Sequence, residues 1–294
     1  MKTVLVTGAA GFTGRFMTAA LEQKNYHVIG LVHSTKGPGQ GLPCDLTDAV
    51  AVAEAMREIK PDYVVHLAAL SFVGHRDSEA FYRVNLFGTL HLLEALAALP
   101  VPPRKVLVAS SANVYGTPAV EVIDESVCPA PVNHYANSKL AMEHMVRTWF
   151  DRLPILITRP FNYTGPGQAP VFLVPKIVEH FRRRSPTIEL GNLDVSRDFS
   201  DVRDVVAAYA ALLETDAVSE TVNICRGEAT PLRGIIDIMN RLAGYEIEVK
   251  VNPAFVRSKE ISRLQGDNTR LKRLVGTVPS IPIQETLQWM LDAS

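Results

Sequence analysis

Short apolar segments alternate with longer amphipathic segments through the first half of the chain. The short runs are rich in valine, isoleucine and leucine and occupy residues 2–8, 27–33, 62–69, 105–111 and 154–160. The segments between them have apolar residues every three or four positions and occupy 12–24, 47–60, 78–99 and 133–152. Because the short runs are apolar on both faces, they predict a doubly wound parallel α/β sheet with helices on both sides. Thr47 is the expected N-cap of the second helix.

The alternation loosens after residue 160, where proline and glycine become frequent. Residues 1–160 are therefore predicted to form one domain, and residues 161–294 to form mostly a smaller C-terminal lobe. A segment near residues 201–226 is expected to return to the sheet. Ligands of such folds bind beyond the carboxyl ends of the strands, so the lobe is predicted to hold a substrate against that edge.

Composition excludes several classes of function. The chain has 294 residues, 47% of them hydrophobic, and a formal net charge of −1, which suits a large core and argues against electrostatic binding of nucleic acid. We expect no membrane partner and a cytoplasmic location, because no signal peptide or membrane-spanning apolar run is visible. Cys44, Cys128 and Cys225 lie far apart, so we expect no metal site and a reducing compartment.

The first chemical signal is the segment TGAAGFTG at residues 7–14. Gly8, Gly11 and Gly14 follow a strand and open a helix, where glycines let backbone N–H groups approach a pyrophosphate. Phe12 and Thr13 lie within the same turn. This context predicts a Rossmann-type dinucleotide site at the first strand–helix turn.

The end of the second strand bears on the choice between NAD and NADP. A carboxylate there would bind the adenosine ribose, but the position holds His33, followed by Ser34. Since no carboxylate is present there to repel a 2′-phosphate, we favour NADP(H), with NAD(H) as the alternative. Asp45 and Leu46, in the segment CDL, are expected to reach the adenine end of the dinucleotide.

Further motifs follow in a fixed order along the chain. They are HLAA at 66–69, NLFGT at 85–89, SSANVYG at 110–116, YANSK at 135–139 and RPFNYTGPG at 159–167. With the glycine turn, they resemble the extended short-chain dehydrogenase/reductase family over essentially the whole chain. The resemblance implies that Ser111, Tyr135 and Lys139 are catalytic. It also implies cofactor contacts from Leu67, Ala68, Ala69, Asn85, Tyr135 and Lys139.

The chemistry explains the spacing of Tyr135 and Lys139, which lie on one face of the expected helix. A free tyrosine loses its proton near pH ~10, too high for proton transfer at neutrality. A neighbouring ammonium stabilises the phenolate, so Lys139 is expected to lower the pKa of Tyr135. Tyr135 is then expected to protonate a carbonyl oxygen that Ser111 also binds, while hydride attacks the carbon.

Among the reactions of the family that the sequence resembles, Asn113 restricts which one is expected. Nucleotide-sugar 4,6-dehydratases usually carry a glutamate base at this position, and an amide cannot abstract a proton. GDP-fucose synthases need a cysteine at about the same place and a histidine downstream, which this sequence does not offer. Simple hydride transfer is therefore the predicted chemistry, with Ser111 and Asn113 in contact with the substrate.

The second half resembles enzymes that act on GDP-mannose derivatives, through RPFNYTGPGQ, VPKIVEHF and VRSKEISRLQ. The resemblance implies substrate contacts from Asn162, Lys176, Arg197, Arg257 and Glu260, and the cations among them suit a diphosphate. The expected reaction is the NAD(P)H-dependent reduction of the C4 carbonyl of GDP-4-dehydro-6-deoxy-D-mannose. Its expected product is GDP-D-rhamnose, a lipopolysaccharide precursor.

Three alternatives stay open. Reduction on the opposite face would give GDP-6-deoxy-D-talose. A UDP-sugar 4-epimerase would keep NAD tightly bound and need no added reductant. A regulatory protein that only senses the dinucleotide would be expected to lack Tyr135 or Lys139.

The resemblance also implies a homodimer built from the helices near 78–99 and 133–152. The apolar residues that could serve it are Leu86, Leu90, Leu93, Met142 and Met145. A helix of this kind needs one apolar stripe for its own sheet, and only a second stripe argues for a partner. The other interpretation is therefore that these residues pack on the sheet.

Overall fold

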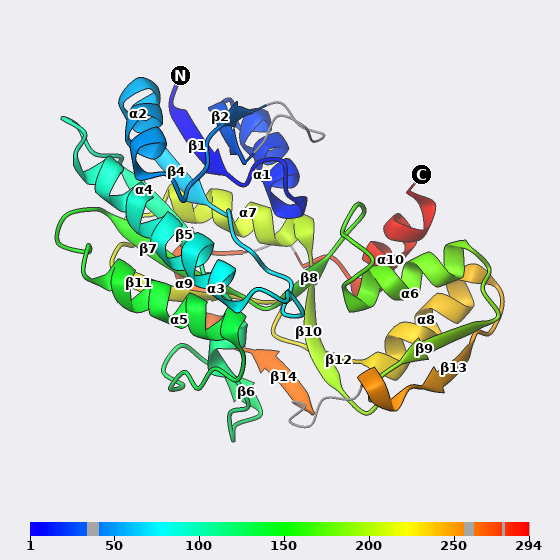
Figure 1. Ribbon diagram of the computed structural model, residues 1–294. Coiled ribbons are helices and arrows are strands. Elements are labelled where there is room, and N and C mark those ends of the chain that lie inside the picture. Colours follow the sequence, from blue (N-terminus) through cyan, green and yellow to red (C-terminus); the bar gives the residue numbers. More distant parts are fainter. Residues whose placement is uncertain (34–40, 256–261, 278–279, 294) are drawn as a thin grey trace.

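A seven-stranded parallel sheet forms the centre of the fold (Figure 1). The computed structural model describes residues 1–33, 41–255, 262–277 and 280–293, so the predicted site residues Ser34, Arg257 and Glu260 lie outside the described residues. The strand order is β11–β7–β5–β4–β1–β2–β3, and each neighbouring pair is parallel. The strands are β1 (Thr3–Thr7), β2 (His27–Val32), β3 (Leu42–Pro43), β4 (Tyr63–His66), β5 (Lys105–Ala109), β7 (Ile155–Pro160) and β11 (Glu220–Ile224). The predicted doubly wound parallel sheet is confirmed.

Alternate residues of the first strand divide the core into two layers. Val4 and Val6 face one layer and Leu5 faces the other, and all three side chains are fully buried. The first layer contains α1 (Phe12–Gln23), α7 (Val202–Leu213) and α9 (Thr269–Val275). The second contains α2 (Ala49–Ile59), α4 (Gly88–Ala97) and α5 (His134–Arg147). Burial of each such aliphatic side chain contributes about 1.5–3 kcal/mol, so both helix layers are firmly attached to the sheet.

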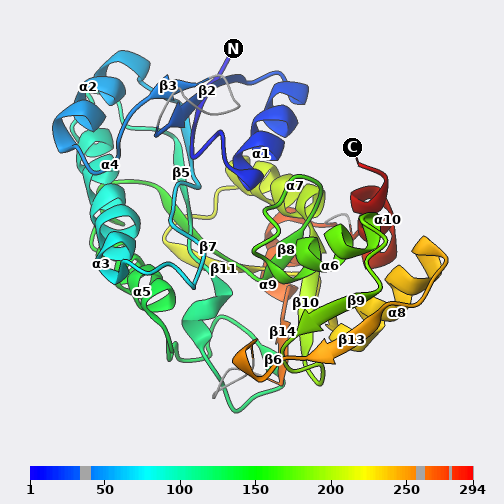
Figure 2. The same ribbon diagram turned by 45° about the vertical axis from the view of Figure 1, so that its right-hand side comes forward.

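A smaller lobe packs around its own apolar core beside β10 (Figure 2). Its helices are α6 (Leu173–Arg182), α8 (Leu232–Ala243) and α10 (Ile283–Asp292), and its two-stranded sheet pairs β9 (Thr187–Leu190) with β13 (Glu248–Val251). A five-stranded sheet joins β12 (Ala229–Pro231), β10 (Ser196–Asp201), β14 (Arg263–Gly266), β6 (Val122–Ile123) and β8 (Asn162–Thr164). Strands from both halves of the chain therefore share this sheet.

The helix predicted over 78–99 is present as α3 (Ser78–Phe81), a π-helical segment η1 (Tyr82–Phe87) and α4 in direct succession. The predicted N-cap of the second helix is wrong. The N-cap of α2 is Asp48, whose carboxylate accepts from the backbone N–H groups of Val50 and Ala51. Thr47 does not cap the helix, because its hydroxyl donates to Asp45 Oδ1 at 2.8 Å.

The residues predicted for a homodimer interface are partly used inside the chain. Leu93 and Met142 are fully buried against the sheet, which agrees with the packing interpretation for these two. Leu86 and Met145 are partly buried against the same core. The homodimer stays a prediction. Among the described residues, no helix has both the length and the apolar character needed to cross a membrane.

Candidate active site

The glycine turn between β1 and α1 is too tightly packed for larger side chains. Gly8 has a φ of +70°, and a Cβ there would lie 2.9 Å from the backbone of Ala68. A Cβ on Gly14 would lie 2.1 Å from the carbonyl oxygen of Gly8. The turn therefore requires glycine at these two positions, which lets its backbone approach a ligand closely.

The N-terminus of α1 carries backbone donors that no side chain caps. Its N-cap, Gly11, provides no side-chain acceptor. Helices α2, α5 and α7 of the same domain are capped by Asp48, Asn133 and Asp201. Uncapped N–H groups at a helix N-terminus suit an anion, so this turn fits the pyrophosphate of a dinucleotide.

Thr13 in the first turn of α1 connects the turn to the second half of the chain. Its hydroxyl lies 2.8 Å from the phenol oxygen of Tyr163 on β8, and the Tyr163 ring stacks on Phe12. Arg15, two residues further along α1, donates to the carbonyl of Gly167. The turn is thus held against the segment that carries RPFNYTGPG.

The sequence indicated no carboxylate beside the end of the second strand, but the structure places one at this adenine end of the predicted dinucleotide site. The carboxylate of Asp45 lies 3.8 Å from His33 Nδ1, so a carboxylate does stand beside the end of β2. Burial raises the pKa of Asp45, but hydrogen bonds from Thr47 and the charge of His33 outweigh it, so the net pKa is lowered. The sequence missed this because residues from two separate segments meet here. Leu46, next to Asp45, is fixed by His91, whose Nδ1 lies 2.9 Å from the Leu46 carbonyl oxygen.

A buried histidine joins the glycine turn to the catalytic region. His66 Nδ1 lies 2.7 Å from Thr7 Oγ1, and His66 Nε2 lies 2.8 Å from Thr89 Oγ1. The Thr89 hydroxyl donates to the Asn85 carbonyl, so it accepts from Nε2–H, and the Thr7 hydroxyl donates to Nδ1. Burial, with the charge of Lys139, lowers the pKa of His66 to about 3, so this histidine stays neutral near physiological pH.

The predicted HLAA segment is held by the same threonine. The N–H groups of Leu67 and Ala68 donate to Thr7 Oγ1 at 3.2 and 3.1 Å. Ala69 follows directly in this segment. Thr7 therefore fixes the end of β4 against the glycine turn, where the cofactor contacts of residues 67–69 were predicted.

Asn85, in η1, extends this network to the catalytic helix. Its amide exchanges hydrogen bonds with the backbone N–H and carbonyl of Leu70, at 2.9 and 3.1 Å. It also donates to Ser138 Oγ at 3.0 Å, and Ser138 donates to the carbonyl of Tyr135. Asn85 is fully buried, and π-helical turns are frequent at functional sites. Asn85 therefore joins the segment after β4 to α5.

Ser111 and Ser110 have different surroundings. Ser111 Oγ accepts from the N–H of Asn113 at 3.2 Å as the N-cap of the 3₁₀ turn η2 (Ala112–Tyr115), and it hydrogen-bonds the Tyr135 side chain. Ser110 Oγ is buried and finds no hydrogen-bond partner among the described residues. The catalytic role of Ser111 stays a prediction.

The expected lowering of the pKa of Tyr135 is not found, because burial dominates and Lys139 is not among the groups that shift this pKa. Burial raises the pKa of Tyr135 to about 12, while the hydrogen bond from Ser111 opposes the rise and Tyr163 adds to it. The Lys139 ammonium instead donates to the Ala109 carbonyl at 2.7 Å. The expectation failed because helical spacing gives the neighbour of a phenol but not its loss of solvent.

Lys139 is itself a buried cation, 3% exposed. Burial lowers its pKa to about 8, while the charge of Glu143 acts in the opposite direction. At neutral pH the ammonium is therefore still mostly protonated. It lies beside the Ala109 carbonyl at the end of β5, two residues before Ser111.

The predicted substrate residues of the lobe have separate environments. Asn162 Nδ2, on β8, is buried and finds no acceptor among the described residues. Lys176 Nζ donates to the Glu189 carbonyl at 2.7 Å and lies 4.5 Å from the centre of the Phe255 ring. Arg197, on β10, donates to the Ser196 carbonyl at 2.9 Å. The structure does not bring these three into contact with Tyr135 through any hydrogen bond described here.

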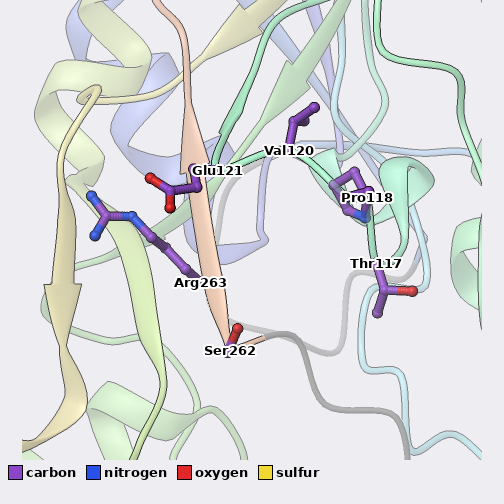
Figure 3. A pocket seen from close by; sticks show the side chains of 7 residues that line it. Thr117, Pro118, Val120, Glu121, Ser262 and Arg263 are labelled. Carbon is purple, nitrogen blue, oxygen red and sulfur yellow. The ribbon is translucent and has the colours of Figure 1, made fainter.

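An open pocket of about 470 Å³ lies next to the segment that carries Ser111 (Figure 3). It is lined by Thr117, Pro118, Ala119, Val120, Glu121, Ser262 and Arg263. The first five lie just after η2 and its C-cap, Gly116, and the last two are the residue before β14 and the first residue of β14. The described lining includes none of the predicted site residues, so this pocket is distinct from the Tyr135 hydroxyl.

Several residues of the site were not predicted from the sequence. The buried bonds of His66, Thr89, Ser138 and Tyr163 place them in the site's framework. His66 and Tyr163 do stand inside the recognised HLAA and RPFNYTGPG segments, so attention to the polar letters there could have found them. Among the described residues, no group of three or more His, Cys, Asp or Glu side chains could hold a metal ion.

Comparison with known proteins agrees with this geometry. The chain matches the model of the NAD dependent epimerase/dehydratase family over residues 4–225. GDP-6-deoxy-D-talose 4-dehydrogenase from Aggregatibacter actinomycetemcomitans is 38% identical over 275 residues, 93% of this chain and 91% of that protein. GDP-6-deoxy-D-mannose reductase from Pseudomonas aeruginosa is 33% identical over 301 residues, 98% of this chain and 95% of that protein.

Solved structures agree as well. The structure of RMD from Pseudomonas aeruginosa complexed with NADPH has a TM-score of 0.87 at 33% identity, and the match covers 99% of this chain and 96% of that chain. The resemblance to the extended short-chain dehydrogenase/reductases is therefore confirmed, along with the Rossmann-like fold. The chain belongs to the NAD dependent epimerase/dehydratase family.

Proposed function

We propose that this protein is a nucleotide-sugar oxidoreductase that reduces the C4 carbonyl of GDP-4-dehydro-6-deoxy-D-mannose with a nicotinamide dinucleotide. Two relatives whose names specify GDP and a 6-deoxy sugar support the substrate class. The proposal rests on one observation, the Tyr135 phenol within hydrogen-bonding reach of the Ser111 hydroxyl. We propose reduction because such a pair supplies an acid and a second hydrogen-bond donor to one oxygen.

Tyr135 is the acid of this proposal. With a pKa of about 12, its phenol carries a proton at neutral pH and can donate it to a developing alkoxide. Ser111 Oγ, already within hydrogen-bonding reach of the phenol, binds the same oxygen and orients the carbonyl. When bound, a reduced nicotinamide supplies the hydride. Tyr135 is only 7% exposed, so water competes poorly for its proton.

The cofactor is held by the first half of the chain in this proposal. The glycine turn and the uncapped N-terminus of α1 fit a pyrophosphate. The residues proposed to hold it are Gly8, Gly11, Phe12, Thr13 and Gly14. We keep NADP(H) as the favoured cofactor, because the residue that directly follows β2 is His33 and not a carboxylate. NAD(H) is the alternative, because the Asp45 carboxylate lies 3.8 Å from His33.

The identity of the product is the most specific part of the proposal. GDP-D-rhamnose and GDP-6-deoxy-D-talose differ in the face of C4 that receives hydride, and the relatives named above divide between the two sugars. We propose GDP-D-rhamnose first and GDP-6-deoxy-D-talose as the second candidate. A UDP-sugar 4-epimerase is the third, because the family model includes epimerases.

The test is consumption of NADPH and NADH with GDP-4-dehydro-6-deoxy-D-mannose, followed by NMR of the product. Oxidation of either cofactor, lost in Tyr135→Phe, supports the reductase. The configuration at C4 then decides between the rhamno and talo products. If neither cofactor is oxidised, and the purified protein retains NAD and interconverts UDP-sugars without added reductant, the reductase proposal is rejected in favour of the epimerase.

A further inference from the structure

The buried face of α5 carries a carboxylate directly after the catalytic lysine. Tyr135, Lys139 and Glu143 lie four residues apart on the same helix, and all three are buried. Glu143 is completely excluded from solvent. An isolated carboxylate would be strongly destabilising at such a position, so a buried Glu143 has to be compensated.

Arg159, on β7, supplies most of that compensation. Its Nε and Nη2 donate to the two oxygens of Glu143 at 2.9 and 2.6 Å, and Arg159 is only 3% exposed. Arg147 Nη2 lies 3.5 Å from the same carboxylate. The Arg159 guanidinium also lies over the Tyr115 ring, 4.7 Å from its centre. A bidentate pair of this kind fixes the orientation of the carboxylate.

Few other charges face Lys139. His66, on β4, is neutral at physiological pH, and Tyr135 is protonated. The Lys139 ammonium itself donates to a neutral carbonyl, that of Ala109. Glu143 is the one negative charge among the described groups that acts on Lys139.

The helices packed on α5 add no buried charge near this lysine. Arg83 and Glu79, on η1 and α3, are exposed and pair with each other at 3.8 Å. Glu94, on α4, is also exposed. The remaining charges near Glu143 are the two arginines that bind it, Arg147 and Arg159.

We propose that Glu143 is a positioning residue for the reaction, whose carboxylate, fixed by Arg159, keeps the Lys139 ammonium charged one helical turn from Tyr135. The proposal rests on the proposed function of the site, in which Tyr135 is the acid. Glu143 itself touches neither substrate nor cofactor. It acts through Lys139, and Arg159 acts through Glu143.

The test uses two variants that break the same ion pair in opposite ways. Glu143→Gln removes the negative charge behind Lys139, whereas Arg159→Met leaves the carboxylate in place, with Arg147 still beside it. The titration of Lys139 is followed by NMR in protein labelled with carbon-13 at the lysine Cε, and the Lys139 resonance is assigned by its loss in Lys139→Met. This measurement needs no substrate, so it is independent of whether the proposed reaction occurs.

The proposal predicts that Glu143→Gln lowers the midpoint of the Lys139 titration by about one pH unit or more, because an opposite charge nearby favours the ammonium. Arg159→Met should leave the midpoint unchanged or raise it. Equal lowering in both variants would mean that loss of the pair is merely structural, and no lowering in Glu143→Gln would also overturn the proposal.

A second comparison covers the case in which Glu143→Gln does not fold, since it leaves Arg159 without its carboxylate. The double variant Glu143→Gln/Arg159→Met is then compared with Arg159→Met alone, because these two proteins differ only in the charge at residue 143. The proposal expects the lower midpoint in the double variant, and equal midpoints would reject it. In the active protein, the alkaline limit of turnover should move in the same direction as the NMR midpoint.

Discussion

The two lysines of the candidate site show how differently the sheet domain and the lobe use a cation. Lys139, on α5, is 3% exposed, is bound to a carbonyl at the end of β5 and has its pKa lowered to about 8 by burial. Lys176, on α6, is also bound to a backbone carbonyl, but it is only partly buried and lies over the Phe255 ring. The sheet domain therefore holds its cation at a cost in solvation, whereas the lobe leaves its cation partly hydrated.

This difference separates chemistry from recognition. A buried, fixed group gains electrostatic strength, because little water screens it. A partly exposed lysine attracts a diphosphate as a point charge, and water and salt weaken that attraction. Substitutions in the sheet domain should therefore change the rate of the chemical step, and substitutions in the lobe should change substrate binding.

The largest effect is expected from Tyr135→Phe. The change removes only the phenol oxygen, and we expect turnover to fall by about 10³–10⁴-fold, because general acid catalysis is lost. The free energy of unfolding should change little, since the ring and its burial are kept. Steady-state kinetics with thermal unfolding of both proteins measures this. Turnover within a factor of about ten of the parent would show that another group supplies the proton.

The next effect is expected from the buried His66 and concerns acid stability. The folded protein holds His66 neutral with a pKa of about 3, whereas an unfolded histidine titrates near 6.5. The unfolded chain therefore binds the additional proton in this window. The stabilisation is present above pH 6.5 and is lost as the pH falls toward 3, by an amount on the order of 4 kcal/mol.

His66→Gln tests this slope, since glutamine keeps one donor and one acceptor but cannot titrate. The free energy of unfolding should depend less steeply on pH between about 6.5 and 3 in the variant than in the parent. Burial raises the pKa of the Asp198 and Asp204 carboxyls to about 6, but both groups are present in both proteins and cancel. Identical slopes would mean that His66 accepts a proton in the folded state.

The features that could be predicted from the sequence are those that depend on residues close together in the chain. The glycine turn and the spacing of Tyr135 and Lys139 depend on residues close together in the chain, so local pattern was enough to place them. The sheet was predictable because its strands are apolar on both faces. The division of the chain near residue 160 stays a prediction, as do the substrate contacts of the lobe.

Other features depend on residues that meet only in the folded chain. Glu143 and Arg159 are 16 residues apart, and an amphipathic helix pattern does not tell whether a glutamate is buried. Asp45 reaches His33 from another segment, which removed the argument that no carboxylate stands there. The π-helical turn around Asn85 leaves no clear signal in the apolar spacing. The predicted lowering of the pKa of Tyr135 was wrong because desolvation depends on everything packed around the phenol.

A smaller effect is expected from the neighbouring serines. Ser111→Ala removes the hydroxyl that meets Tyr135, and we expect turnover to fall by about 100-fold, as for other donors to a developing oxyanion. Ser110→Ala is the matched control, since Ser110 Oγ finds no partner among the described residues. It should leave turnover nearly unchanged. The same kinetic assay on both variants distinguishes them, and a larger loss from Ser110→Ala would reverse the assignment of the reacting hydroxyl.

The smallest effect is expected from Lys176→Met in the lobe. Methionine keeps much of the apolar stem over Phe255 and removes only the charge that is proposed to attract the diphosphate. We expect KM for the GDP-sugar to rise by about 3–10-fold with turnover unchanged, because a cation that water still reaches contributes about 1 kcal/mol.

Lys250→Met, on β13 of the same lobe, is the matched control, since Lys250 pairs with Glu248 at 3.5 Å. The parent KM should rise with salt, and that dependence should weaken in Lys176→Met but not in Lys250→Met. A fall in turnover with KM unchanged would place Lys176 in the chemical step and end the contrast between the lobe and the sheet domain.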